Sequence, residues 1–166
     1  TSGAGAANTV GIEITTNSAR VNSSAGLIRL IGSTTLKSAT NFGIVVSNGF
    51  IGNNGSLATV ELIADAMQFS TFSSVLIHST QAATLRPLTP GFNISLGVAD
   101  VPNTSLGLTG AELDAITAGF IRIGDASSGE ITLGANVGRS SSGNVTLTPG
   151  LNRNLTLTGF SLTLAG

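Results

Sequence analysis

Apolar residues recur every sixteen positions along the first hundred residues, and this repeat constrains the fold more than any other feature of the sequence. One register of the repeat holds Ile12, Ile28, Ile44, Val60, Leu76 and Phe92. A second register, two residues further on, holds Ile14, Leu30, Val46, Leu62, His78 and Ile94. Apolar residues at positions i and i+2 are typical of a strand with one buried face. We therefore expect each repeat to open with a strand, and the six residues of the first register to form one inward ladder.

A repeat of this length cannot bury its apolar face alone, so successive copies have to stack on one another. No helix-period stripe runs through residues 1–98, which favours strands over helical repeats. The repeat predicts an all-β fold, a parallel β-helix or β-solenoid, in one domain over residues 1–166. A β-sandwich is the alternative, because regular short strands also suit that fold.

The pattern changes over residues 99–119, which we expect to be an insertion in the repeat. Thr109 and Glu112 have the spacing of a capping box, in which each side chain binds the backbone N–H of the other residue. We expect a short helix from Gly110 to Thr117, ended by Gly119, that covers an edge or a corner of the stacked repeats.

Strand patterns return over residues 120–166, at wider spacing than before. The interval from Ile121 to Val145 equals the interval from Ile131 to Leu155. This shared spacing predicts further coils of the chain, each carrying two of these strands.

The composition excludes several classes of partner. Charged residues make up 9% of the chain, against roughly 25% in an ordinary soluble domain. The net charge is −1 and the seven Lys and Arg residues do not cluster, so we expect no nucleic acid partner and no membrane insertion. The absence of Cys excludes disulfides, thiolate metal sites and Cys nucleophiles.

Residues 108–133 read LTGAELDAITAGFIRIGDASSGEITL. This run resembles a recurrent segment of large bacterial surface proteins related to filamentous haemagglutinin. The strings GNVTLT and NLTLT that follow are similar to repeats of the same group. The resemblance implies a right-handed parallel β-helix, export across the cell envelope, and a role as a stalk or adhesin segment. It carries over no catalytic residue, because the motif is structural in that family.

The acidic residues are the first candidates for chemistry. They are Glu13, Glu61, Asp65, Asp100, Glu112, Asp114, Asp125 and Glu130. A glycosidase or lyase needs two carboxyl groups that face each other across a groove. On the sixteen-residue register Glu13 and Glu61 share an outward position, with Arg29 and Val45 between them. We interpret this column as a solvated ladder with partial charge compensation, rather than as a catalytic pair.

The other candidate sites are weaker. His78 is the single His and falls on an apolar strand position without partners for a triad or a zinc site, so we interpret it as a core or edge residue. Asp125, in the string GDASSG, suggests a calcium turn, but the calcium-binding nonapeptide does not repeat. We expect no catalytic residue, no metal ligand and no cofactor.

Threonines recur at expected outward strand positions: Thr132, Thr146, Thr148, Thr156, Thr158 and Thr163. Flat threonine arrays hold ordered water on ice in some β-solenoids. Outward Thr is also the ordinary choice for the polar face of a sheet, and we prefer that interpretation.

These observations predict a non-enzymatic extracellular structural protein of the bacterial cell surface, working as a spacer, fibre subunit or adhesin segment. The chain begins with Thr and has no signal-peptide pattern, so we expect a processed chain or a piece of a longer one. The first twelve residues carry no charge, and residues 152–166 carry one, Arg153. Neither end looks capped, which predicts head-to-tail association into filaments or continuation into a larger β-helix. The alternative is a surface module that binds ice or a host or biofilm glycan.

Overall fold

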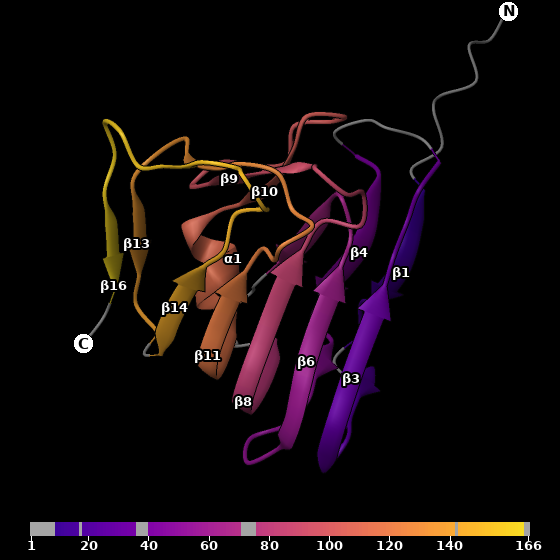
Figure 1. Cartoon of the computed structure of the whole chain (residues 1–166). Helices are drawn as coiled ribbons and strands as arrows, with labels where there is room; N and C mark the ends of the chain where they lie inside the picture. Colours follow the sequence, from indigo (N-terminus) through magenta and orange to yellow (C-terminus); the bar gives the residue numbers. More distant parts are fainter. Residues whose placement is uncertain (1–8, 17, 36–39, 71–75, 142, 165–166) are drawn as a thin grey trace, which may run out of the picture.

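The computed structural model describes residues 9–164 except 17, 36–39, 71–75 and 142. The two ends of the predicted domain, residues 1–8 and 165–166, therefore lie outside the described part. The structure is all-β, with 52% of residues in strands and 3% in helix, and its sheets are parallel. Figure 1 shows the strands lying side by side in rows.

In chain order the elements are β1 (Val10–Ile14), β2 (Arg20–Val21), β3 (Ala25–Ile31), β4 (Phe42–Ser47), β5 (Phe50–Ile51), β6 (Leu57–Ile63), β7 (Met67–Ser70), β8 (Ile77–Arg86), β9 (Asn93–Leu96), β10 (Ser105–Leu108), α1 (Gly110–Asp114), β11 (Ile116–Ile123), β12 (Ile131–Leu133), β13 (Val137–Arg139), β14 (Asn144–Leu147), β15 (Leu155–Thr156) and β16 (Leu162–Leu164).

These strands form four sheets. The largest runs in the order β14-β11-β8-β5-β2, and it also contains β6 beside β8 and β3 beside β6. The others have the orders β1-β4-β7, β10-β9-β12-β15 and β13-β16. Every pairing between named strands in the described part is parallel.

In the first strands, the chain returns to the same sheet after two sixteen-residue repeats, and not after one. Ile12 on β1 pairs with Ile44 on β4, two repeats later, and Ile44 pairs in turn with Met67 on β7. Ile28 and Val60 pair on a different sheet, between β3 and β6. The prediction of a single inward ladder is therefore wrong, because alternate members of the register belong to two sheets.

The apolar character of these positions is nevertheless used by the fold. Leu76 is buried just before β8, and Phe92 is partly buried just before β9. Together with the four strand residues of the register, they lie in or against one hydrophobic cluster. Spacing along the chain shows that a residue faces inward, but it does not distinguish one sheet from two that alternate.

The equal spacing at the C-terminal end is confirmed as strand pairing. Ile121 lies opposite Val145, and Ile131 lies opposite Leu155. The number of residues between the preceding pair of partners is larger: Ile131 also pairs with Ile94, on the side away from Leu155. Residues 99–119 belong to this longer interval.

The predicted insertion contains a strand as well as the helix. Strand β10 pairs with β9 on the side away from β12. Helix α1 begins as predicted, with both hydrogen bonds of the capping box between Thr109 and Glu112 present. Its predicted end at Thr117 is wrong: Ile116 already begins β11 and pairs with Ile77 on β8. Long-range pairing here overrides the local helical pattern.

Gly119 therefore lies inside a strand and does not end the helix. A Cβ atom at this position would stand 2.6 Å from the carbonyl oxygen of Thr80. We interpret this glycine as a response to the close approach between β11 and β8.

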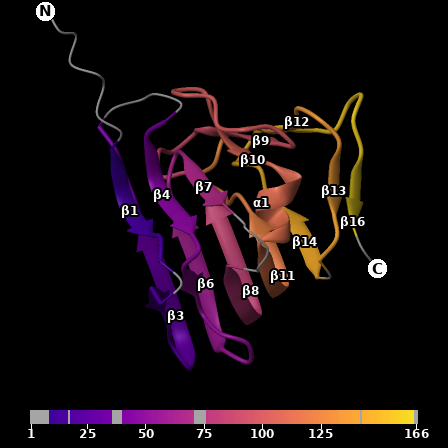
Figure 2. The same ribbon diagram turned by 180° about the vertical axis from the view of Figure 1, so that it is seen from behind.

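Helix α1 occupies the place of a strand in one face of the molecule. Figure 2 shows β1, β4, β7, α1, β13 and β16 following one another in a row. The helix contacts β7 on one side and β13 on the other. It thus separates the three-stranded sheet from the two-stranded sheet, so the backbone groups of the neighbouring strand edge need partners other than a strand.

Candidate functional site

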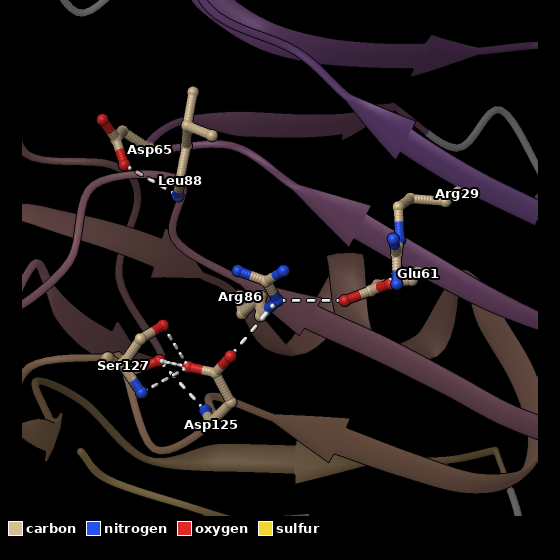
Figure 3. A network of polar contacts seen from close by, with 8 residues as sticks. Arg29, Glu61, Asp65, Arg86, Leu88, Asp125 and Ser127 are labelled. Carbon is tan, nitrogen blue, oxygen red and sulfur yellow. Dashed lines mark hydrogen bonds and ion pairs between the residues drawn. The ribbon is translucent and has the colours of Figure 1, made fainter. Parts of the chain in front are cut away.

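A chain of opposite charges crosses the outer face of the largest sheet, as Figure 3 shows. Glu61 on β6 accepts hydrogen bonds from Nε of Arg29 on β3 and, at 3.0 Å, from Nε of Arg86 on β8. The Arg86 Nε atom also lies 3.3 Å from Oδ2 of Asp125, in the loop after β11. We call these four residues the charge ladder.

The charge ladder confirms half of the predicted column and corrects the rest. Arg29 and Glu61 are paired neighbours on adjacent strands. Glu13 lies on β1 opposite Val45, in another sheet, so the column joining Glu13 to Glu61 is wrong. The reason is again that the sixteen-residue register alternates between sheets.

The carboxyl groups of the charge ladder are held in the ionised form. Burial raises the pKa of Glu61, but hydrogen bonds from Arg29 and Arg86 outweigh burial and keep this pKa below its ordinary value. Burial also raises the pKa of Asp125, and hydrogen bonds from Ser127 and Ser128 together with the charge of Arg86 lower it further than burial raises it. Carboxylates stabilised in this way are poorly suited to donate a proton near neutral pH.

The turn at Asp125, where we expect no metal, is closed by its own side chains. Oδ1 of Asp125 accepts hydrogen bonds from the backbone N–H of Ser127 at 2.9 Å and from its hydroxyl at 2.7 Å. The hydroxyl of Ser128 lies 3.1 Å from the same oxygen. Within the described residues, no three His, Cys, Asp or Glu side chains gather in a group that could hold a metal ion.

Three further acidic side chains contact N–H groups in turns and loops near the ends of strands. Oδ1 of Asp65 accepts from the backbone N–H groups of Leu88 and Thr89, at 2.9 and 2.8 Å. Asp114, at the end of α1, accepts from the two backbone N–H groups that follow β13. Oε1 of Glu130 lies 3.5 Å from the side-chain amide of Asn154. These contacts tie turns to neighbouring layers.

His78 and the threonines occupy ordinary strand positions. His78 is half-buried on β8, opposite Thr117 on β11. Thr132 lies between Ser95 and Thr156 in the sheet of β9, β12 and β15. The other strand threonines, Thr146 and Thr163, belong to two further sheets, so these residues do not form one flat array.

Two carboxyl groups that the sequence did not bring together lie along the edge of β7. Oδ2 of Asp100 accepts a hydrogen bond from the backbone N–H of Met67 at 3.1 Å, and its Oδ1 accepts one from Gly107 at 2.7 Å. Oε1 of Glu112 accepts one from Phe69 at 3.3 Å. Glu112 was recognisable as a capping residue, but no local signal predicts the contact between Asp100 and the distant Met67.

Asp100 combines a place in two pockets with a strongly raised pKa. Asp100 and Asp65 both line a pocket of about 160 Å³, and Asp100 and Glu112 both line one of about 360 Å³. Burial raises the pKa of Asp100 to about 7, against the lowering effect of its two backbone hydrogen bonds, and the charge of Glu112 adds to the rise. A perturbed carboxyl group in a cleft is a candidate for function.

No protein-family model, no curated protein and no solved structure matches the chain. In the part of the chain that the structure describes, no helix is long and apolar enough to cross a membrane.

Proposed function

We propose that this chain is a segment of a right-handed parallel β-helix that acts as a stalk, fibre subunit or adhesin segment outside the cell. The observation that supports this most strongly is the repeated parallel pairing of successive strands around one hydrophobic cluster. A β-sandwich is built from antiparallel sheets and does not account for it. Each added layer extends such a structure by about 4.8 Å, so its function is to provide length and surface.

The state of the acidic residues supports a structural rather than an enzymatic function. Glu61 and Asp125 are engaged by arginines, and Asp100 and Glu112 are engaged by the edge of β7. These contacts hold the four carboxyl groups as hydrogen-bond and ion-pair partners of strands and loops, as expected of structural residues. The separate threonine columns give no reason to prefer ice binding.

The terminal layers of the described structure support association along the axis. Leu155 is 43% exposed, although Ile131, its partner in the preceding layer, is fully buried. Leu164 on β16 and Val10 on β1 are similarly exposed, at 40% and 36%. An open layer presents unpaired backbone groups and the apolar interior, which another layer would cover.

We propose a second copy of this chain as the occupant of the exposed end, bound head to tail. Such a contact joins two different surfaces and need not close, so it generates filaments. The exposed leucines at one end and Val10 at the other are the surfaces that would meet.

Sedimentation velocity and negative-stain imaging of the purified chain test this proposal. We expect association that increases with concentration, and filaments in the images. Leu155→Lys places a charge in the end face and should abolish association. Leu57→Lys is the matched control, because Leu57 is 58% exposed on β6, a strand that is paired on both sides by β3 and β8 and so has no open edge.

Two results would contradict the proposal. One is a wild-type chain that stays monomeric at every concentration. The other is an equal loss of association in both lysine variants, which would point to lateral rather than axial contact.

A further inference from the structure

The edge of β7 that faces away from β4 is covered by side chains instead of a strand. In its sheet, β7 pairs with β4 and with no second strand among the described residues. The backbone N–H groups of Met67 and Phe69 are two residues apart and therefore point to the same side. Asp100 accepts from the first and Glu112 from the second. Carboxyl oxygens thus replace the carbonyl groups of a neighbouring strand.

Asp100 fastens two elements at once. It lies in residues 97–104, which connect β9 to β10, and its second oxygen binds the backbone N–H of Gly107 on β10. A Cβ atom at Gly107 would overlap the carbonyl group of Ala99, so the connection approaches β10 more closely than any side chain would allow. The Asp100 carboxyl group therefore joins the connection, β10 and β7.

The surroundings of Asp100 contain like charges and no opposite charge. Strands β4, β7 and β10, which lie around it, contribute no ionisable side chain. Helix α1 contributes Glu112, and Asp65 lines the smaller pocket together with Asp100. The other acid of α1, Asp114, binds the residues after β13. No basic side chain of the described chain lines either pocket.

We propose that residues 97–108 form an acid-stabilised latch on β7, which is closed while Asp100 carries a proton and opens more readily once Asp100 is ionised. Opening would return the carboxyl group to water and uncover the backbone N–H of Met67 at the edge of β7. An uncovered strand edge is a template for pairing with another strand. The latch would thus control, through pH, access to a binding edge in the middle of the molecule. This inference does not depend on the proposed structural role.

The direction of the effect follows from linkage between protonation and opening. In the closed state burial raises the pKa of Asp100 from its ordinary 3.8 to about 7. Between these two values the closed state holds a proton that the open state has lost. The closed state therefore becomes less stable as pH rises from about 4 to about 7, and changes no further above that. The opening equilibrium constant rises by at most about tenfold per pH unit in this window.

Hydrogen exchange measured by mass spectrometry on the full chain tests the latch. The opening constants of peptides from residues 97–108, corrected for the intrinsic pH dependence of exchange, should rise between about pH 5 and 7 and level off above about 7. In Asp100→Asn this rise should disappear. Peptides from β12, which lies beyond β9 in the same sheet, provide an internal control and should show no such rise.

Glu112→Gln provides a second variant in case Asp100→Asn does not fold. Gln keeps the capping box with Thr109 but removes the charge near Asp100. We expect the rise in opening to level off at a lower pH than in the wild type. Glu130→Gln removes a charge elsewhere and should leave the profile unchanged. Opening constants that stay flat across this pH window in the wild type, or the same rise in Asp100→Asn, would overturn the proposal.

Discussion

The buried side chain of Arg139 binds backbone carbonyl groups beside α1, where the helix takes the place of a strand. Arg139 on β13 is 3% exposed. Its guanidinium donates to the backbone carbonyl groups of Leu113 at 3.3 Å, Ile116 at 2.7 Å and Ser141 at 2.5 Å. A neighbouring strand would normally supply such donors. Arginine carries five N–H groups in a rigid plane, which allows one side chain to satisfy several carbonyl groups.

We expect Arg139→Met to destabilise the protein strongly. The substitution removes the donor from the buried carbonyl group of Ile116 and one donor from that of Leu113, at a cost of about 3 kcal/mol in the free energy of unfolding. Urea denaturation measures this loss. Arg122→Met is the control, because Arg122 is exposed on β11 and its loss should change stability by no more than about 0.5 kcal/mol. Equal stability of the two variants would show that the Arg139 contacts contribute nothing.

At the scale of elements, helix α1 is held by local and distant contacts of different origin. The capping box lies within one turn of the helix, whereas Glu112 also binds the distant Phe69. The same carboxyl group thus starts the helix and attaches it to β7. Loss of the cap should therefore weaken the attachment as well as the helix.

Thr109→Ala should lower the free energy of unfolding by about 1 kcal/mol, because it removes the hydroxyl that accepts from the backbone N–H of Glu112. Thermal unfolding measures the change. Thr109→Ser keeps the hydroxyl and should retain most of the wild-type stability. If the serine variant were as unstable as the alanine variant, the methyl group of Thr109 rather than the cap would be responsible.

These elements also show how far the sequence predicts this fold. The inward positions, the start of α1 and the pairing of Ile121 with Val145 follow from patterns over short stretches of the sequence. The end of α1 depends on the pairing of Ile116 with Ile77, on a strand far earlier in the sequence. The position of Asp100 against β7 depends on how a connection folds back, for which the sequence carries no periodic signal.

At the scale of the whole molecule, the apolar interior is continuous. One cluster of buried residues extends from Ile14 on β1 to Val137 on β13. Residues of all four sheets lie in or against this cluster, so the loss of one sheet would expose buried residues of the others. This continuity predicts one cooperative unit, as does the single domain expected from the sequence.

We expect Ile44→Ala and Ile121→Ala, at fully buried positions on different sheets, to destabilise the same unfolding transition. Each should cost about 2–5 kcal/mol through lost burial and the cavity left behind. Calorimetry and denaturant titration should both show one transition that moves as a whole. Two transitions, with only one affected by each variant, would divide the molecule into independent units.

The number of residues between paired strands varies along this chain, and this number can change without changing the length of the molecule along its axis. The chain returns from Ile44 to its partner Met67 after a short path, whereas a much longer path leads from Ile94 to Ile131. Hydrogen bonding fixes the distance between neighbouring strands at about 4.8 Å in both cases. Extra residues between two paired strands therefore add bulk at the side of the molecule, and they leave the spacing between the strands unchanged. Insertions between strands can vary what such a protein displays along its flanks without altering how far it extends.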